Sequence, residues 1–519
     1  MIHIRKRTFL INALILTATA FLLRAIDIYF RVFLSDKIGT EGMGLFQLIF
    51  TIYALAITFA TSNLSLSVTR MVAEEAGKGN STKPILHKSF KISLLFSISA
   101  GILLFCMSDF IGIALLHDER TILSLKTLSF CLPFIAASSC LNGYFIAKRK
   151  AVKSAASQIF EQIIQIIIVL FTLNFFVGKG LEYACFAICL GATVAELASF
   201  LFSFLLYLFE KKETAKTHHV GMIRRIFGIC LPMALSSYLR MGLMTTENLL
   251  IPIGLMKSGS SRHVALSQFG IIKAMVFPVM FFPAAFLSSF SSLLIPEISE
   301  AYALSEQKRL NYTIERALQI TMIFSILVTG IFLFFSSELS KAIYGNYDTA
   351  FYLKILSPLI PLMYLDSIVD SILKGMNQQV GLLKINVFDS VTRIIFIFFL
   401  IPAFGIYGLI IVLFYSNILN PMLSLLKLIK VSQLRPSYTN LLFKPILCIC
   451  LSCLLPLLLC KILHVQLNLI FIIGLSTVFY LVLIRISECV SHEDVEWAKG
   501  VFATQKEKTK GSKKLKNSY

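Results

Sequence analysis

The chain has 519 residues, of which 57% are hydrophobic and only 15% are charged, and its mean hydropathy is +0.80. A soluble protein of this length needs far more polar surface, and the long apolar runs do not alternate as barrel strands do, so both of these classes are excluded. The net charge of +20 would suggest a nucleic-acid partner in a soluble protein, but none is expected for a membrane chain. The sequence therefore predicts an all-α polytopic membrane protein.

Fourteen apolar segments follow one another along the chain, and each is long enough to form a transmembrane helix. Their approximate limits, in chain order, are 8–34, 43–69, 90–116, 121–147, 154–177, 181–209, 225–255, 264–296, 315–337, 350–373, 380–402, 405–430, 441–463 and 466–487.

Basic residues concentrate on one side of this predicted topology. They precede the first segment and follow the even-numbered ones, for example at 5–7, 148–150, 211–216 and 427–435, whereas the opposite loops hold few. By the positive-inside rule we expect an even number of spans and two cytoplasmic termini, in a multi-pass protein of the cytoplasmic membrane. The basic start resembles a signal peptide, but no cleavage site follows it, so we expect a retained first helix.

An internal repeat relates two long stretches of the chain. The sequence around Gln47 resembles that around Gln268, and LPFIAASSCLNGYFIAKRK resembles IPLMYLDSIVDSILKGMNQQ at an offset of six helices. An even offset gives both copies the same orientation, which is typical of transporters built from parallel repeats. We therefore predict two six-helix lobes, two extra C-terminal helices and a basic cytoplasmic tail, with the limits 1–210, 211–436, 437–487 and 488–519.

Charged residues at membrane depth are costly and normally face a protein cavity. Arg24, Asp27 and Arg31 follow one another at helical spacings of three and four, so one face of the first helix holds all three. Arg240 and Lys273 also lie far from the ends of their predicted helices. Arginine binds phosphate bidentately and keeps its charge, so such a group of cations would suit a pyrophosphate.

The alternative to ligand binding is that these cations only stabilise the packing of the helices. Each one would then neutralise Asp27, Glu161 or Glu247 and only hold the helices together. Asp389 and Arg393 are four residues apart, which favours an ion pair within one helix.

Enzyme, metal and cofactor motifs are missing from the sequence. The eleven cysteines lie mostly in apolar runs without the spacing of a metal cluster, so we expect neither a metal site nor disulfides. The sequence contains neither a Walker A motif nor GxGxxG nor HExxH, and we predict a protein that is not an enzyme and binds no cofactor. An ion gradient, of a monovalent cation or of protons, or the gradient of the substrate itself would then drive transport.

The first eighty residues resemble a known family. In LLRAIDIYFRVFLSDKIGTEGMGLFQL, the residues that match its pattern are Arg24, Arg31, Ile38, Gly39, Glu41, Gly42, Gly44 and Leu45. This is the opening of the stage V sporulation protein B and lipid II flippase family, within the MATE-like superfamily. The resemblance implies a V-shaped transporter of two lobes that works by alternating access.

The resemblance also implies a site. Basic residues of the central cavity, here Arg24, Arg31, Arg240 and Lys273, would hold the pyrophosphate of a lipid-linked sugar, and the last two helices would form a groove for its lipid tail. The family often has glycine where this chain has Asp27. Asp27 can pair with Arg24 or with Arg31, and either pair would lower the positive charge of the cavity. Asp27, Glu161 and Glu247 are the candidates for charge pairing or ion coupling.

Two functions from different classes remain at this point. The first is a flippase that moves an undecaprenyl-pyrophosphate-linked sugar, such as lipid II or a related polysaccharide precursor, in spore cortex or cell-envelope synthesis. The second is a cation-coupled multidrug exporter that uses Asp27 as its ion site. The extra helix pair and the basic residues favour the flippase. A membrane glycosyltransferase would need large external loops, which the sequence does not have.

Overall fold

The computed structural model of the chain describes residues 2–78, 80–210, 221–433, 443–463, 468–487 and 489, with side chains described at all of these except 2–14, 16, 289, 292, 293 and 455–463. Throughout these ranges the regular structure is helical, with no strand. Contacts divide the chain into two compact units, 1–282 with 390–412, and 283–389 with 413–519. These limits differ from those of the predicted lobes, and the repeat-based lobes stay a prediction. The predicted basic tail, apart from Cys489, lies outside the described residues.

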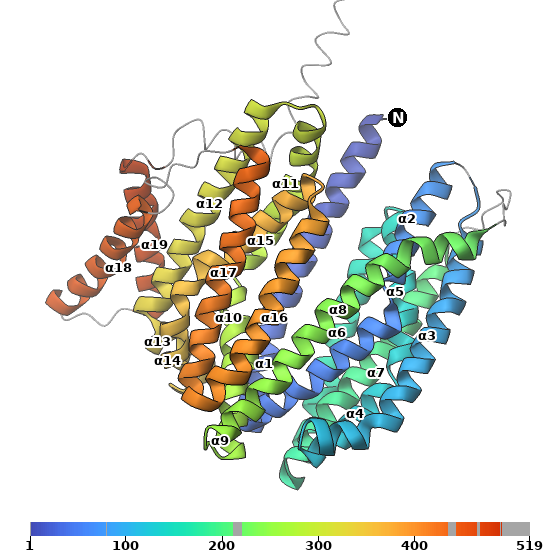
Figure 1. Ribbon diagram of the computed structural model, residues 1–519, viewed down its shortest axis with the longest axis horizontal. Coiled ribbons are helices and arrows are strands. Elements are labelled where there is room, and N and C mark those ends of the chain that lie inside the picture. The colour runs from blue at the N-terminus through green and yellow to red at the C-terminus, as the bar shows by residue number, and fades with distance from the viewer. Residues whose placement is uncertain are drawn as a thin grey trace, which may run out of the picture. The chain divides into compact units, whose positions relative to one another are not determined.

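The first unit contains the helices that precede Pro283. In chain order they are α1 (Ile2–Thr61), α2 (Leu64–Gly77), α3 (Lys83–Phe110), η1 (Ile111–Leu115), η2 (Glu119–Thr121), α4 (Ile122–Ser129), α5 (Leu132–Ala147), α6 (Ala151–Phe176), η3 (Val177–Lys179), α7 (Leu181–Leu208), α8 (Met222–Lys257), α9 (Arg262–Gly270), η4 (Ile271–Val276) and α10 (Phe277–Phe281). Helices α3, α5, α6 and α8 all contact α1, and Figure 1 shows them gathered beside its C-terminal half.

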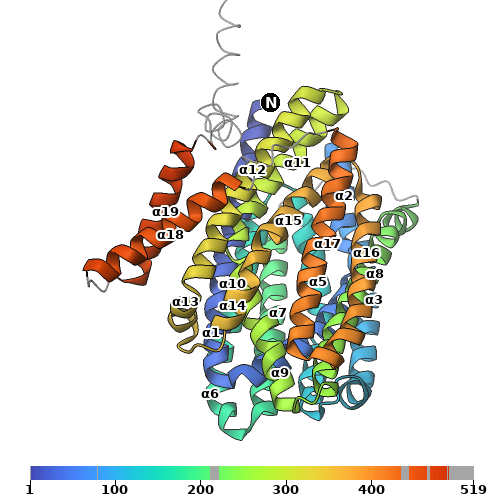
Figure 2. The same ribbon diagram turned by 60° about the vertical axis from the view of Figure 1, so that its left-hand side comes forward.

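The second unit contains α11 (Ala284–Ala303), α12 (Gln307–Phe334), α13 (Ser336–Tyr344), α14 (Ala350–Leu356), η5 (Ser357–Leu359), α15 (Ile360–Gly375), parts of the hairpin α16 (Gln379–Phe404) and α17 (Ile406–Ser432), α18 (Lys444–Leu463) and α19 (Leu469–Ile486). The tip of the hairpin, 390–412, belongs to the first unit. Figure 2 shows α18 and α19 as an adjacent pair. This pair packs on α12, where Gly330 leaves room for Ile449 and the Tyr480 hydroxyl donates to the Ile323 carbonyl at 2.9 Å.

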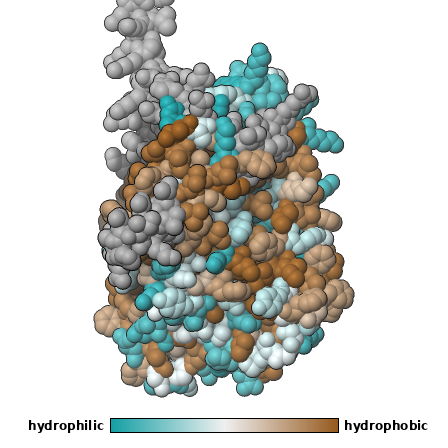
Figure 3. Space-filling view, turned by 90° about the vertical axis from the view of Figure 1, so that its left-hand side faces the viewer, coloured by the Kyte–Doolittle hydropathy of each residue, from teal (hydrophilic) through white to brown (hydrophobic). Residues whose placement is uncertain are grey.

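Membrane spans are plentiful in the part of the chain that the structure describes. Eleven helices are long and apolar enough to cross a membrane, and twelve if the bent pair Glu119–Ser129 and Leu132–Ala147 is one span. Figure 3 shows apolar residues over the middle of one face, with hydrophilic residues gathered toward its ends. Large apolar side chains are also exposed, among them Phe171 and Phe175 of α6. A surface of this kind is stable in lipid and not in water.

The predicted number of fourteen spans stays a prediction. One of the eleven candidates, Thr17–Gly77, has 61 residues, which corresponds to about 90 Å of helix, whereas a bilayer core is about 30 Å thick. Its helix is interrupted at Gly39, which has φ 66° and ψ −176°. Only glycine adopts this conformation without steric cost. The interruption lies between the predicted segments 8–34 and 43–69, so a single candidate covers two predicted spans.

Two glycines bring α1 and α9 into direct backbone contact. A side chain on Gly44 would collide with the carbonyl group of Leu266, and one on Gly270 would collide with the backbone of Thr40 and Gly44. Small residues of this kind allow helices in a membrane to approach closely. The contact places η4, which follows Gly270, against the first half of α1.

Candidate functional site

A cavity of about 300 Å³ lies between α1 and the helical stretch η4–α10 of the first unit. Its polar lining residues are Arg24 and Asp27 from α1 and Lys273 from η4. Its apolar lining residues are Ile28, Phe277, Pro278, Phe281 and Phe282. Charged groups beside aromatic rings suit a ligand that has both an anionic and an apolar part.

Helix geometry explains why the α1 residues share one side of the cavity. Arg24, Asp27 and Ile28 are three and four residues apart, and such positions lie on one face of an α-helix. The same face contacts α10 and the residue after it, because Arg24 Nη1 donates to the Phe281 carbonyl at 3.4 Å and the Phe21 and Phe282 rings lie 5.5 Å apart. Arg24 is otherwise exposed.

Lys273 lies in η4, which is a π-helix between two α-helical turns. Such π segments are rare and occur often at functional sites, because the wider turn changes the direction of the side chains. The Lys273 ammonium lies 5.5 Å from the centre of the Phe277 ring, which also lines the cavity. The sequence predicted a continuous helix over 264–296 and gave no indication of this widened turn.

Asp27 pairs with Arg31 in this structure. Arg31 Nε lies 2.9 Å from Asp27 Oδ2, and Arg31 Nη1 donates to the Ala274 carbonyl at 3.4 Å. The carboxylate charge of Asp27 is therefore balanced within α1, while the Arg24 guanidinium donates to a neutral carbonyl oxygen and pairs with no carboxylate among the described residues. Of the two arginines, Arg24 is the one with charge available to a ligand.

Glu247 of α8 is shared by two cations. Its Oε1 lies 3.1 Å from Lys273 Nζ, and its Oε2 lies 3.1 Å from Nη1 of Arg393, in the part of α16 that belongs to the first unit. The Glu247 side chain is only 6% exposed, against 13% for Lys273 and 24% for Arg393. A buried carboxylate is stable when charges of opposite sign compensate it, and here two of them do.

The charges around the cavity do not cancel. The charged residues that line it are two cations, Arg24 and Lys273, and one carboxylate, Asp27. These three groups leave an excess of one positive charge. Such an excess at membrane depth favours an anionic ligand.

Two of the predicted site residues lie elsewhere. Arg240 is an exposed residue of α8, and the residues that line this cavity do not include it. Glu161 of α6 accepts a hydrogen bond from the Ser199 hydroxyl of α7 at 3.0 Å. The binding role of Arg240 and the coupling role of Glu161 stay predictions.

Sequence reasoning assigned Arg393 to a local pair with Asp389. In the structure Arg393 forms an ion pair with Glu247, and Asp389 accepts hydrogen bonds from the Ser416 hydroxyl at 2.8 and 3.0 Å, while the local pair stays a prediction. The contact with Glu247 joins residues 146 positions apart, and no local spacing indicates it. Only the presence of a guanidinium at membrane depth marked Arg393 as a residue of interest.

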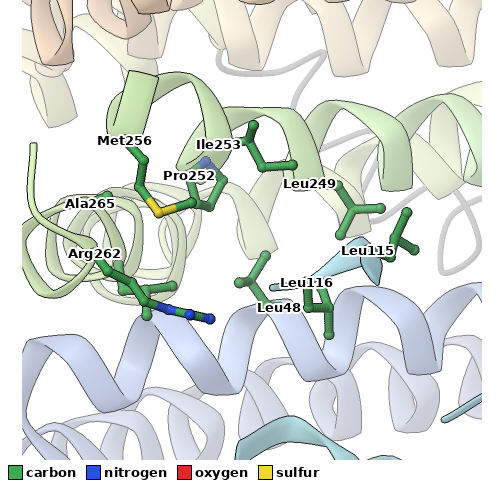
Figure 4. Close-up of a pocket in the computed structure, with 10 residues that line it drawn as sticks. Leu48, Leu115, Leu116, Leu249, Pro252, Ile253, Met256, Arg262 and Ala265 are labelled. Atoms are coloured by element: carbon green, nitrogen blue, oxygen red, sulfur yellow. The ribbon is translucent and has the colours of Figure 1, made fainter. Parts of the chain in front are cut away.

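A second, smaller gap in the first unit is a packing defect and not a site. It lies between α1, η1, α8 and α9, and Figure 4 shows Leu48, Leu116, Leu249, Pro252 and Met256 around it. Its volume is about 10 Å³, which is the lower limit for one water molecule. Its one charged lining residue, Arg262, forms an ion pair with Asp118 at 2.9 Å.

Metal-binding geometry does not occur in the described part of the chain. No group of three or more His, Cys, Asp and Glu residues there could hold an ion. The ten described cysteines are free thiols.

Comparison with known proteins identifies the family. The family model for "polysaccharide biosynthesis protein" matches residues 9–302, more than half of the chain. The chain belongs to the polysaccharide biosynthesis protein family. Stage V sporulation protein B of Bacillus subtilis (strain 168) is a relative with 27% identity, over 78% of this chain and 80% of the relative. The lipid II flippase MurJ of the same organism is 24% identical, over 70% of this chain and 72% of that protein.

Solved structures support the same fold for this family member. One of MurJ in an inward closed conformation has a TM-score of 0.65 at 15% identity and covers 91% of this chain and 98% of its own. An inward-facing MATE family multidrug transporter has a TM-score of 0.63 at 14% identity and covers 81% of this chain and 99% of its own. The predicted family and the predicted all-α polytopic membrane fold are confirmed. Of these similar proteins, MurJ is a lipid II flippase and the MATE protein is a multidrug transporter.

Proposed function

We propose that the protein is a flippase that moves an undecaprenyl-pyrophosphate-linked sugar across the cytoplasmic membrane by alternating access. The substrate would be lipid II or a related polysaccharide precursor of the spore cortex or cell envelope. The observation that carries the proposal is the cavity between α1 and η4–α10, where cationic Arg24 and Lys273 lie beside phenylalanine rings. Its net positive charge suits the pyrophosphate group, and the family's relatives include a lipid II flippase.

In this mechanism Arg24 is the principal phosphate ligand. Its planar guanidinium donates two parallel hydrogen bonds to phosphate oxygens, whereas the Lys273 ammonium acts as a compact point charge. Arg31 would contribute through its position one turn further along α1. Phe277 and Phe281 would contact the first isoprene units next to the pyrophosphate.

The lipid tail needs an apolar path outside this cavity. We propose that α18 and α19 supply it, because residues such as Leu447 and Leu451 of α18 and Phe471 and Val478 of α19 expose their apolar side chains. The proposed topology has both termini in the cytoplasm. An ion gradient, of a monovalent cation or of protons, or the substrate gradient would drive the cycle, with Asp27, Glu161 and Glu247 as the candidate coupling groups.

The second candidate is a cation-coupled multidrug exporter. One observation favours it, because the Asp27 carboxylate lines the cavity, where an ion or a cationic drug could reach it. The pairing of Asp27 with Arg31 argues against this function, since the carboxylate is already neutralised by a permanent cation.

Transport in proteoliposomes separates the two candidates. The full chain is reconstituted with fluorescent lipid II or with a capsule-type lipid-linked sugar, and the fraction of label in each leaflet is followed with a membrane-impermeant quencher. We expect movement of at least one lipid that depends on the protein. A preparation that moves neither lipid but accumulates a cationic dye under an imposed ion gradient would contradict the flippase and favour the exporter.

A further inference from the structure

Arg393 is the feature that the proposed function leaves unexplained. It does not line the cavity, yet its guanidinium reaches across to α8 and contacts the carboxylate that also holds Lys273. Arg393 belongs to the hairpin tip that packs within the first unit, so the contact is internal to one compact unit. A carboxylate buried at membrane depth needs one cation for neutrality, and Glu247 has two.

The second cation matters when Lys273 binds a ligand. For Lys273 to contact a phosphate in the cavity, its ammonium must weaken or leave its 3.1 Å contact with Glu247 Oε1. Without another partner, Glu247 would then be a buried and uncompensated carboxylate, which is strongly unfavourable. Arg393 keeps its own 3.1 Å contact with Oε2, so the carboxylate remains neutralised during the exchange.

We propose that Arg393 is a positioning residue for substrate binding: it holds Glu247, so that the Lys273 ammonium can exchange this carboxylate for a phosphate of the substrate. This inference rests on the proposed function. Arg393 itself does not touch the ligand. Its guanidinium suits the task because it is permanently charged and its fork of N–H groups fits a carboxylate.

The decisive experiment compares ligand affinity in a single variant and in a double variant. Among the described residues, Arg393→Gln leaves Lys273 as the only cationic partner of Glu247, so binding of a polyprenyl pyrophosphate should weaken by about ten-fold. Adding Glu247→Gln removes the competing carboxylate, and the double variant should bind within about two-fold of the unmodified protein. A merely structural role for Arg393 predicts the opposite, because losing both partners of a buried contact would not restore affinity.

Binding is measured with the purified full-length chain in lipid nanodiscs. Geranylgeranyl pyrophosphate serves as the probe, inorganic pyrophosphate as the headgroup alone and geranylgeraniol as the uncharged control. Arg225→Gln is the matched control variant, because Arg225 also bridges two carboxylates, those of Glu74 and Glu75, away from the cavity. It should leave the affinity unchanged, and thermal unfolding of each variant is recorded alongside.

The outcomes distinguish the inference about Arg393 from the flippase proposal on which it rests. Weakening by Arg393→Gln together with restoration in the double variant supports the inference. If the double variant loses as much affinity as Arg393→Gln, or more, the inference is overturned and the flippase proposal remains. If the unmodified protein binds neither geranylgeranyl pyrophosphate nor inorganic pyrophosphate, both are overturned. If Arg393→Gln does not fold, Glu247→Gln alone decides, because it should bind the probe at least as tightly as the unmodified chain. Weaker binding by that variant overturns the inference.

Discussion

Asp27 and Arg31 form an ion pair one helical turn apart, with Arg31 Nε 2.9 Å from Asp27 Oδ2. Arg24 lies three residues before Asp27 on the same face, but its guanidinium turns toward the carbonyl oxygen of Phe281. Asp27 therefore neutralises Arg31, and Arg24 keeps its positive charge in the cavity. Substitutions of Arg24 and Asp27 should therefore affect transport differently.

Replacing Arg24 by alanine should abolish transport. The substitution removes the one cavity arginine that no carboxylate balances in the described structure, so the pyrophosphate loses its bidentate contact. The loss should reach about 100-fold or more in initial transport rate, because a charge-assisted contact of this kind contributes about 3 kcal/mol. Transport is measured in proteoliposomes containing fluorescent lipid II.

Insertion and folding should be unaffected by this substitution, because Arg24 is an exposed side chain. Equal expression and an unchanged elution profile are the controls. A folded Arg24→Ala protein that still moves lipid II at the normal rate would refute a role for Arg24 in binding.

Replacing Asp27 by glycine should preserve flippase activity. The change removes the carboxylate that neutralises Arg31 and adds one unit of positive charge beside the cavity. A glycine within a helix costs about 1 kcal/mol, which a packed helix tolerates. If Asp27 instead binds a coupling ion, the variant will lose gradient-driven transport completely at normal expression, and this result would favour the exporter.

Much of this arrangement follows from the sequence. The apolar runs predict where α3, α6, α7, α16 and α17 lie, because lipid requires about twenty apolar residues for each crossing. The spacing of Arg24, Asp27 and Arg31 also predicts that they share one helix face, and the structure confirms it. These are local properties, and local sequence determines them.

The remainder of the site depends on contacts between distant residues. Glu247, Lys273 and Arg393 come from three helices, and no spacing pattern indicates the contact between Arg393 and Glu247. Backbone irregularities were missed as well. Ser62 and Asn63 both have positive φ, 45° and 54°, between α1 and α2, within a segment predicted as one helix. Asn63 adopts this conformation with its amide donating to the Ser237 hydroxyl of α8 at 2.8 Å, a partner that lies 174 residues away.

Glu210 should make the stability of the first unit depend on pH. Its carboxylate accepts hydrogen bonds from Lys150 at 2.7 Å and Lys153 at 2.9 Å, which join the start of α6 to the end of α7. Burial tends to raise the pKa of Glu210, but the two ammonium groups outweigh it, and the pKa lies below its ordinary value. The pair therefore stabilises the fold above the unfolded pKa of about 4.3, and this contribution disappears as the pH falls through the lower, folded pKa.

The measurement for Glu210 is a comparison with Glu210→Gln. At pH 7 the variant should unfold at a slightly lower temperature, by an amount that corresponds to about 1 kcal/mol or less, because Lys150 is half exposed. The difference should shrink as the pH falls below about 4.3. A difference that is constant between pH 7 and pH 3.5 would show that the ion pairs do not contribute.

Deleting α18 and α19, from Lys444 onward, should leave a folded protein that no longer moves long-chain lipid-linked sugars. The pair packs on α12 through Ile449 and Tyr480, and the surface exposed by its loss includes the apolar residues Met322 and Ile326, which lipid can cover. The cavity lies wholly within the other compact unit and should keep its pyrophosphate ligands.

The truncated chain should therefore still bind geranylgeranyl pyrophosphate within about two-fold of the full chain, because the headgroup contacts remain. A full-length undecaprenyl substrate should not be transported, since an aqueous cavity offers no apolar path for its tail. Both are assayed in the same nanodisc and proteoliposome preparations, with Arg24→Ala in the truncated background as the control for specific binding. Equal transport of short and long substrates by the truncated protein would assign α18 and α19 to another task, such as docking a partner protein.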